Sequence, residues 1–152
     1  MLNVADVAPE FELLDSEGQP VKLSDFRGRR LVLFFYPKAG TSGCTTQACG
    51  LRDNFPKIEA GNATVVGVSP DQPAALAKWK SEENLPYPLL SDPDHQVAEA
   101  YGVWGEKKLY GRSYMGIIRS HFIIDAEGKI EDVQFKVSPK NSISRAVAVL
   151  EG

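Results

Sequence analysis

The chain is organised around residues 31–50, which read LVLFFYPKAGTSGCTTQACG. The stretch opens with six apolar or aromatic residues, Leu31 to Tyr36, a run typical of a strand buried on both faces of a mostly parallel sheet. Glycines and a proline interrupt the next segment, and good helix formers take over from Cys44 onward, so we expect a helix to begin near Cys44. A cysteine would therefore lie where a central strand leads into a helix.

This position has chemical consequences for Cys44. The first turn of a helix leaves backbone N–H groups without a helical partner and carries the positive end of the helix dipole, and both features favour a thiolate. In open α/β sheets, ligands also bind at this edge, beyond the carboxyl ends of the strands. The sequence thus predicts a reactive thiol where binding sites usually form.

Length and composition predict one globular domain over residues 1–152. The 17 Lys and Arg residues against 20 Asp and Glu give a net charge of -3, and no basic cluster suggests nucleic-acid binding. The first residues lack the basic and apolar regions of a secretory signal, and no apolar run is long enough to span a membrane. We therefore expect a cytoplasmic protein, in a reducing compartment where cysteine pairs are more often catalytic or metal-binding than permanently bonded. We also expect a monomer, although the sequence does not fix the oligomeric state.

Outside residues 31–50, alternating strand and helix patterns predict an α/β sandwich with a mixed sheet. Before the central stretch we expect a hairpin over 11–23 and a helical turn that is capped by Ser24 and stopped by Gly28. After it we expect a strand over 64–69, a helix that is capped by Asp71 or Gln72 and ends before Pro86, a strand over 89–91, and a helix that is opened by Asp92 and Pro93 and stopped by Gly102. The chain should close with a hairpin over 121–137 and a helix capped by Asn141. Residues 103–118 have no clear period and are expected to form a long surface excursion.

The spacing of Cys44 and Cys49 argues against a permanent disulfide. Five residues on an ideal helix separate the two Cα atoms by about 8 to 9 Å, beyond the ~7 Å that an unstrained disulfide allows. The first turns of the helix would have to unwind before the cysteines could bond, and the flanking Gly43 and Gly50 would lower the cost of that change. The spacing fits a transient redox disulfide, with a buried helix cysteine of no chemical role as the alternative.

Two other uses of the cysteines fit the sequence poorly. A zinc site needs four ligands at closer spacings, and the two histidines, His95 and His121, are far from the cysteines and from each other, so we expect no metal and no other cofactor. A hydrolase of the Cys-His type would need one of these histidines beside Cys44. Each histidine is more simply explained as structural.

The pattern Pro37-x-x-x-Thr41-x-x-Cys44 resembles the active-site signature of peroxiredoxins, and Cys49 resembles that of the Q, or bacterioferritin-comigratory, branch. The resemblance covers nearly the whole chain. It continues through Phe26-Arg-Gly, Phe34-Phe-Tyr-Pro-Lys, Ala48-Cys-Gly-Leu-Arg-Asp, Leu89-Leu-Ser-Asp, Tyr101-Gly-Val-Trp-Gly and Gly116-Ile-Ile-Arg119.

This resemblance implies a thioredoxin-like fold, a three-layer sandwich of helices around a mixed sheet, and a thiol-dependent peroxidase that acts on hydroperoxides. Cys44 would be the peroxidatic cysteine and Cys49 the resolving cysteine, and thioredoxin or a glutaredoxin-type protein would return both thiols. The remaining implied roles are peroxide binding by Thr41, a positive charge beside the sulfur from Arg119, and a pocket formed by Pro37 and the backbone N–H groups of Gly43 and Cys44.

Simpler readings of single residues stay open. Thr41 could be a turn or capping residue, and Arg119 could be a solvated charge at a strand start. Arg52 also matches the family, but it could simply form an ion pair on the helix surface with Asp53 or a neighbour. The sequence departs from the family at Ser42, where proline is usual. Serine restores a backbone N–H and should make the loop less rigid, which puts the stiffness of the pocket in doubt.

Two rival functions remain. A general thiol-disulfide oxidoreductase on the same fold normally has two residues between its cysteines, whereas this chain has four. A peroxide sensor or interaction module could use the same reversible disulfide as a conformational switch. The preferred hydroperoxide does not follow from the sequence.

Overall fold

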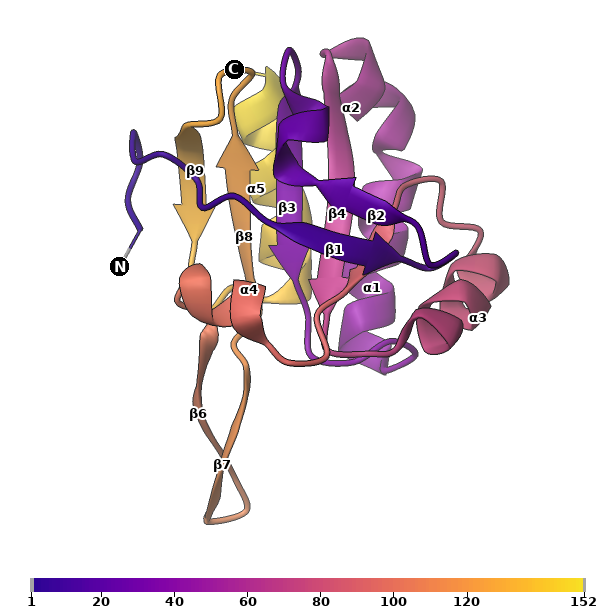
Figure 1. The fold of residues 1–152 in the computed structure, drawn as a ribbon, viewed down its shortest axis with the longest axis vertical. Coiled ribbons are helices and arrows are strands. Elements are labelled where there is room, and N and C mark those ends of the chain that lie inside the picture. The colour runs from indigo at the N-terminus through magenta and orange to yellow at the C-terminus, as the bar shows by residue number, and fades with distance from the viewer. Residues whose placement is uncertain (1, 152) are drawn as a thin grey trace.

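A computed structural model describes residues 2–151, and it contains the expected mixed α/β sandwich. Within these residues, seven strands form one sheet in the order β2-β1-β5-β4-β3-β8-β9 (Figure 1). The strands are β1 (Glu12–Asp15), β2 (Pro20–Lys22), β3 (Arg30–Phe35), β4 (Ala63–Ser69), β5 (Leu89–Ser91), β8 (Ser120–Ile124) and β9 (Ile130–Gln134). The central strands β3, β4 and β5 are parallel, as their apolar runs predict, and β8 pairs antiparallel with β3.

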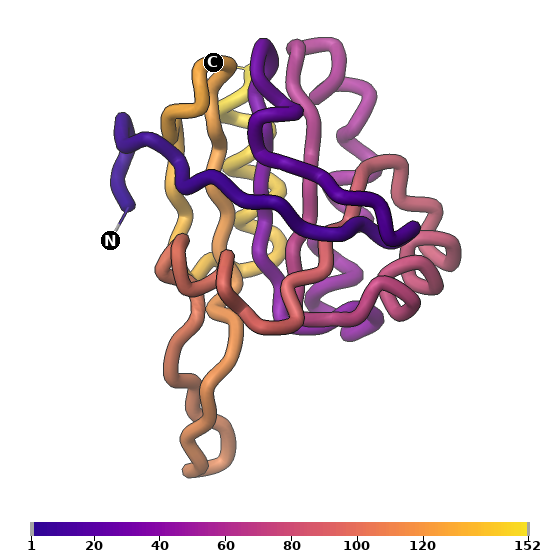
Figure 2. Tube along the Cα trace, viewed as in Figure 1, coloured from indigo at the N-terminus to yellow at the C-terminus, as the bar shows by residue number. Residues whose placement is uncertain are grey.

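One part of the chain extends away from this sheet. Strands β6 (Trp104–Leu109) and β7 (Arg112–Ile117) pair with each other as an antiparallel hairpin, which projects from one end of the molecule (Figure 2). Residues 103–118 therefore do form a surface excursion, as predicted, but the prediction missed the two strands that compose it. The turn residues Tyr110 and Gly111 both have positive φ, at 51° and 75°, as tight hairpins require. The strands escaped prediction because most of their residues are exposed on both faces, so polar and apolar residues do not alternate.

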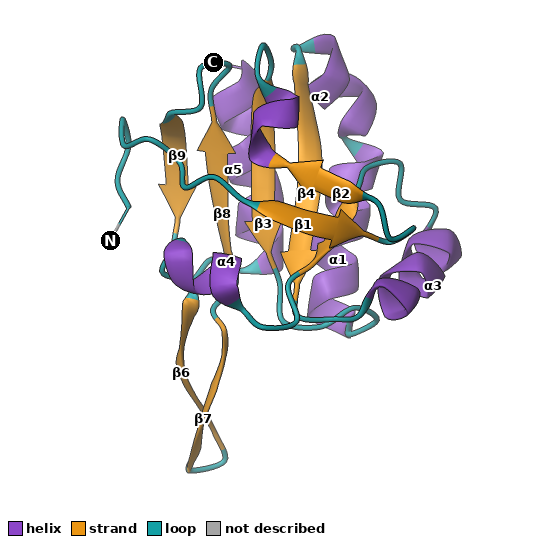
Figure 3. Ribbon diagram, viewed as in Figure 1, coloured by secondary structure: helices purple, strands orange, loops and turns teal. Residues whose placement is uncertain are grey.

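The two faces of the main sheet carry separate hydrophobic clusters. Along β3, the side chains of Leu31, Leu33 and Phe35 pack into one cluster, and those of Val32 and Phe34 pack into the other. The second cluster is covered by the longer helices (Figure 3). The helices are α1 (Ser42–Asp53), α2 (Phe55–Ala60), α3 (Pro73–Glu83), α4 (Gln96–Ala100) and α5 (Pro139–Glu151), together with the 3-10 turn η1 (Leu23–Phe26). Helix α4 and η1 pack on the other face.

Some predicted helix starts are wrong by a few residues. Ser24 lies inside η1, whose cap is Lys22, and Asn141 lies inside α5, which already begins at Pro139. Helix α4 begins at Gln96 instead of at Pro93, although the Asp92 carboxylate still accepts hydrogen bonds from backbone N–H groups of its first turn.

The C-terminal hairpin is shorter than predicted. Strand β9 ends at Gln134, because Lys136 adopts a positive φ of 55° and turns the chain toward α5. The alternation of Val133, Phe135 and Val137 therefore does not belong to one strand. The segment after β9 instead forms part of a groove beside the candidate site.

Candidate active site

The candidate site lies where β3 passes into α1, at the carboxyl end of a central strand. Thr41 occupies the position before the helix, and its carbonyl accepts a hydrogen bond from the Thr45 N–H at 2.9 Å. Asp71, from the connection after β4, accepts a hydrogen bond from the Ala39 N–H at 2.8 Å. The loop is therefore tied both to its own helix and to the neighbouring strand connection.

Cys44 is the third residue of α1, and its side chain is fully buried. The guanidinium of Arg119 reaches it from the other side of the loop, with Nη2 3.4 Å from Sγ. The sheet register explains this contact, because Ser120 of β8 pairs with Phe35 at the end of β3. The residue before Ser120 therefore lies beside the start of the β3–α1 loop, although it is 75 residues from Cys44 in sequence.

Gln47 takes part in the site and was missed by the sequence reasoning. Arg119 donates a second hydrogen bond, from Nη1 to Gln47 Oε1, at 2.6 Å. Gln47 is fully buried and lies three residues after Cys44, so the two side chains share a face of α1. That spacing is the signal that could have found it.

Gly43 makes the approach of Arg119 possible. A Cβ atom at this position would lie 3.2 Å from Arg119 Nη2 and 3.6 Å from Pro139 Cγ. A larger residue would push on the guanidinium that contacts Cys44. The glycine thus has a packing reason in addition to the exposed backbone N–H expected of a first helical turn.

Cys49 lies on the same helix as Cys44, and both cysteines are free thiols. Its Sγ donates a hydrogen bond to Glu83 Oε2 at 3.3 Å, and Arg52 donates to the Glu83 carbonyl at 2.7 Å. Burial and then the hydrogen bond to Glu83 raise the pKa of the Cys49 thiol, against an opposing effect of Arg52. Cys49 is therefore held as a thiol against the end of α3. Arg52 also pairs with Asp53, at 3.0 Å, as the simpler reading of this residue had it.

The other predicted site residues belong to the β3–α1 loop and the start of α1. The exposed Thr41 donates its hydroxyl to the Lys38 carbonyl at 2.8 Å, and Pro37 is half-buried directly after Tyr36. Ser42 is exposed and is the first residue of α1, and its carbonyl accepts a hydrogen bond from the Thr46 hydroxyl at 3.0 Å.

The two histidines have different surroundings. His95 stacks on Trp104, with ring centroids 3.8 Å apart. His121 is fully buried, and its ring nitrogens lie 2.8 Å from Ser142 Oγ and 3.2 Å from Asp132 Oδ2.

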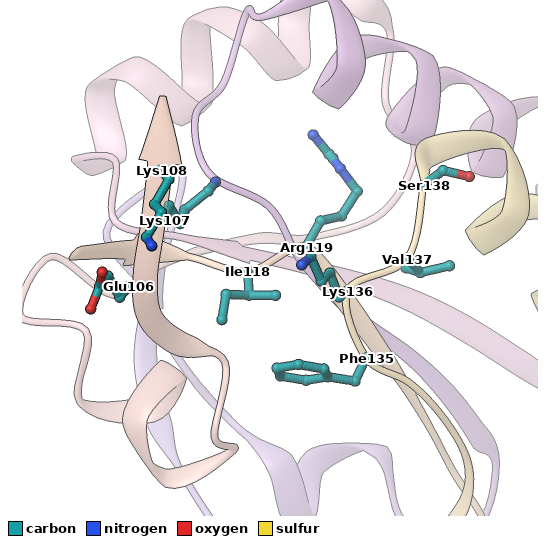
Figure 4. A pocket seen from close by; sticks show the side chains of 9 residues that line it. All are labelled: Glu106, Lys107, Lys108, Ile118, Arg119, Phe135, Lys136, Val137 and Ser138. Carbon is teal, nitrogen blue, oxygen red and sulfur yellow. The ribbon is translucent and has the colours of Figure 1, made fainter. Parts of the chain in front are cut away.

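A groove of about 860 Å³ opens beside Arg119. It lies between the β6–β7 hairpin and the segment that links β9 to α5, and its side chains are shown in Figure 4. Ile118 and Phe135 give it apolar surface, cationic side chains line it at Lys107, Lys108, Arg119 and Lys136, and Glu106 adds one carboxylate. The groove therefore combines apolar surface with positive charge.

Comparisons with known proteins agree with the fold and with the sequence resemblance. Residues 4–133 match the model of the AhpC/TSA family. The peroxiredoxin Bcp of Escherichia coli K12 is 49% identical over 144 residues, which cover 93% of this chain and 92% of that protein.

Solved structures agree as well. The peroxidoxin BcpB of Mycobacterium tuberculosis superposes with a TM-score of 0.89 at 36% identity, over 99% of this chain and 97% of that one. The bacterioferritin comigratory protein of Xanthomonas campestris superposes with a TM-score of 0.89 at 30% identity, over 99% and 96% of the two chains. The chain therefore belongs to the AhpC/TSA family and is a peroxiredoxin similar to those of the Bcp, or Q, type, with their thioredoxin-like fold.

Proposed function

We propose that this peroxiredoxin reduces hydrogen peroxide and organic hydroperoxides with Cys44 as the attacking thiolate. The observation that carries the proposal is the contact of 3.4 Å between Arg119 Nη2 and Cys44 Sγ in the first turn of α1. A fixed positive charge and the helix N-terminus both favour the thiolate over the thiol. The E. coli relative is itself named a peroxiredoxin, which supports the same reaction here.

In the first step, the Cys44 sulfur attacks one oxygen of the peroxide and the O–O bond breaks. Two electrons pass from sulfur to oxygen, and the leaving alkoxide or hydroxide takes up a proton, which leaves a sulfenic acid on Cys44. Donors aimed at the oxygens stabilise the charge that develops on them. Arg119 and the backbone N–H groups of Gly43 and Cys44 take this role. The Thr41 hydroxyl donates its proton to the Lys38 carbonyl, so it binds the peroxide by accepting a hydrogen bond from it, and Pro37 forms part of the pocket wall.

In the second step, Cys49 attacks the sulfenic sulfur, water leaves, and an intramolecular disulfide forms. The two cysteines lie five residues apart within α1, so its first turns must unwind before the sulfurs can meet. Cys49 must also leave Glu83, with which it shares a hydrogen bond of 3.3 Å in the reduced protein. Thioredoxin, or a glutaredoxin-type dithiol, then reduces the disulfide and becomes oxidised itself.

The groove beside Arg119 supports a role in reducing organic hydroperoxides. Its side chains Ile118 and Phe135 offer apolar contact to an alkyl group beside Arg119, which itself contacts Cys44. The X. campestris relative has been studied for alkyl peroxide reduction, which agrees with this reading.

We further propose that the chain works as a single domain and as a monomer in the cytoplasm. The proposed domain spans residues 1–152, of which Met1 and Gly152 lie outside the described residues. Among residues 2–151, no helix has the length and apolar character needed to cross a membrane.

Peroxide consumption in the presence of thioredoxin, its reductase and NADPH tests the function. Replacing Cys44 with Ser should abolish consumption because the attacking sulfur is gone. Replacing Cys49 with Ser should leave the first turnover intact and stall recycling by thioredoxin. Full activity of Cys44→Ser would refute the assignment of the peroxidatic cysteine, and unaffected cycling of Cys49→Ser would remove Cys49 from the mechanism.

A further inference from the structure

A continuous chain of hydrogen bonds runs from Arg119 at the candidate site to Asp132 on β9, the edge strand of the sheet. Arg119 donates to Gln47, Gln47 Nε2 lies 2.9 Å from Ser142 Oγ, and Ser142 Oγ lies 2.8 Å from His121 Nδ1. His121 Nε2 lies 3.2 Å from Asp132 Oδ2. The chain joins α1 to α5, β8 and β9, the last three elements of the sequence.

The middle of this chain has no access to solvent. Gln47, Ser142 and His121 are all 0% exposed. Buried polar groups of this kind lose more free energy than exposed ones when a hydrogen-bond partner is removed, because water cannot take its place. Each member therefore constrains how its neighbours are oriented.

The two ends of the chain fix the direction of every hydrogen bond between them. The guanidinium of Arg119 can only donate, so Gln47 must present its amide oxygen to Arg119 and its NH₂ group to Ser142. Ser142 Oγ accepts that bond, which leaves its own proton for His121 Nδ1.

At the other end, an ionised Asp132 can only accept, so His121 carries its proton on Nε2. Burial alone would raise the pKa of Asp132, but hydrogen bonds from His121 and Arg145 hold it below its usual value. The carboxylate end of the chain therefore keeps its accepting role at neutral pH.

We propose that Ser142 and His121 are positioning residues, which orient the Gln47 amide so that its oxygen holds Arg119 against Cys44. This inference rests on the proposed role of Cys44 as the peroxidatic cysteine. Neither residue contacts the sulfur; both act through Gln47. Without Ser142, the buried NH₂ group of Gln47 loses its acceptor and the amide is held by Arg119 alone. The amide oxygen is then less firmly placed, and its contact of 2.6 Å with Arg119 weakens.

The first test replaces Ser142 with Ala and uses Ser144→Ala as the matched control. Ser144 lies on the same helix but is exposed, and its hydroxyl donates to the Lys140 carbonyl at 3.1 Å. The rate constant for oxidation of Cys44 by peroxide, measured by stopped flow, should fall about tenfold in Ser142→Ala, the size expected for loss of a hydrogen bond to a charged group. It should not change in Ser144→Ala.

A second readout separates positioning from a loss of stability. The pH at which iodoacetamide alkylates Cys44 at half its maximal rate should rise in Ser142→Ala, measured in a Cys49→Ser background, since Arg119 is then held less firmly against the sulfur. A residue that only stabilises the fold would lower the melting temperature and leave this pH unchanged. The alkylation readout needs no peroxidase activity, so it tests the inference even if the proposed function fails.

Gln47→Glu provides a rescue that only the positioning role predicts. A carboxylate has two equivalent accepting oxygens, so its orientation toward Arg119 needs no help from Ser142. In a Gln47→Glu background, the further change Ser142→Ala should therefore have little effect on oxidation of Cys44. His121→Leu should slow oxidation in the native background, and combining it with Ser142→Ala should add little, because both changes break the same chain. Equal oxidation rates for Ser142→Ala and Ser144→Ala, or a full effect of Ser142→Ala in the Gln47→Glu background, would overturn the inference.

Discussion

The reactivity proposed for Cys44 depends on one side chain that makes two contacts at once. Arg119 donates to Cys44 from Nη2 and to Gln47 from Nη1, so its planar guanidinium is fixed in orientation as well as in position. A lysine carries a single ammonium group and cannot reproduce this fork. The two hydrogen bonds therefore fix the position of the positive charge beside the sulfur, in addition to the electrostatic attraction.

Replacing Arg119 with Lys should therefore slow oxidation of Cys44 even though the positive charge is kept. We expect a loss of roughly tenfold or more, because one hydrogen bond to a charged group is given up, and a larger loss for Arg119→Ala. Stopped-flow oxidation by hydrogen peroxide measures both. Should Arg119→Lys react as fast as the native protein, charge alone would be sufficient and the bidentate contact would have no catalytic value.

Glu83 should control the reactivity of the second cysteine. Its carboxylate lies 3.3 Å from Cys49 Sγ and helps to raise the pKa of that thiol, second to burial. In a Cys44→Ser background, Glu83→Gln should lower the pKa of Cys49 and speed its alkylation by iodoacetamide at neutral pH. The exposed neighbour Glu82 offers a matched control as Glu82→Gln. Identical alkylation rates in the two variants would show that Glu83 does not restrain the thiol.

At the scale of elements, the site depends on the close packing of α1 against α5. Gly50 lets the helices approach, because a Cβ atom there would lie 2.1 Å from Ile143 Cδ1 and 2.8 Å from its Cγ1. Backbone freedom was the predicted use of Gly50, but the close approach of Ile143 shows that its missing side chain matters for packing. Helix α5 also carries Ser142, so a shift of this helix would reach the candidate site.

Gly50→Ala should destabilise the protein by about 1–3 kcal/mol, the usual cost of overpacking a core. Urea denaturation measures the change. Gly61→Ala is the control, since its Cβ would meet its nearest atom at 3.5 Å and its φ of -87° suits alanine. Adding Ile143→Val, which removes the clashing Cδ1, should recover part of the loss. A Gly50→Ala protein as stable as the native one would mean that the helices separate at no cost.

Elements whose burial matches their sequence pattern were predictable. The parallel strands β3 and β4 are buried along nearly their whole length, and their apolar runs indicated this directly. The β6–β7 hairpin was not predictable, since its strands lie in solvent and show no period. The comparisons confirm the predicted family, fold and peroxidase class.

The site was predictable only in part, for a related reason. Cys44 could be predicted as a site residue because a single local segment fixes its position. Arg119 was predicted only through the family resemblance. Gln47 and Ser142 are joined by a hydrogen bond across 95 residues, and no local pattern indicates a contact of that kind. Side chains that act by holding others become visible only once the sheet register and helix packing are known.

At the scale of the whole molecule, one buried carboxylate joins the sheet edge to the C-terminal helix. Asp132 of β9 accepts hydrogen bonds from His121 of β8 and, at 3.0 Å, from Arg145 Nη2 of α5. The Asp132 side chain is only 7% exposed and that of His121 is fully buried, so little water screens their contact, whereas Arg145 is half exposed. The Asp132 carboxylate therefore stabilises the fold and ends the hydrogen-bond chain that leads to Arg119.

This arrangement predicts how stability should depend on pH. The pKa of Asp132 is lowered in the folded protein, so its stabilising effect is present above the unfolded value of about 3.9 and is lost as the pH falls through the folded value. At neutral pH, Asp132→Asn should lower the free energy of unfolding in urea by about 1–3 kcal/mol. The difference from the native protein should shrink as the pH falls below about 4, because the carboxyl of the unfolded chain then takes up its proton while the folded one is still ionised, which favours unfolding. Asp94→Asn, the same change at an exposed position, should show a small difference at every pH. If the difference between Asp132→Asn and the native protein stayed constant with pH, ionisation of Asp132 would contribute nothing to the fold, and its role would be limited to packing.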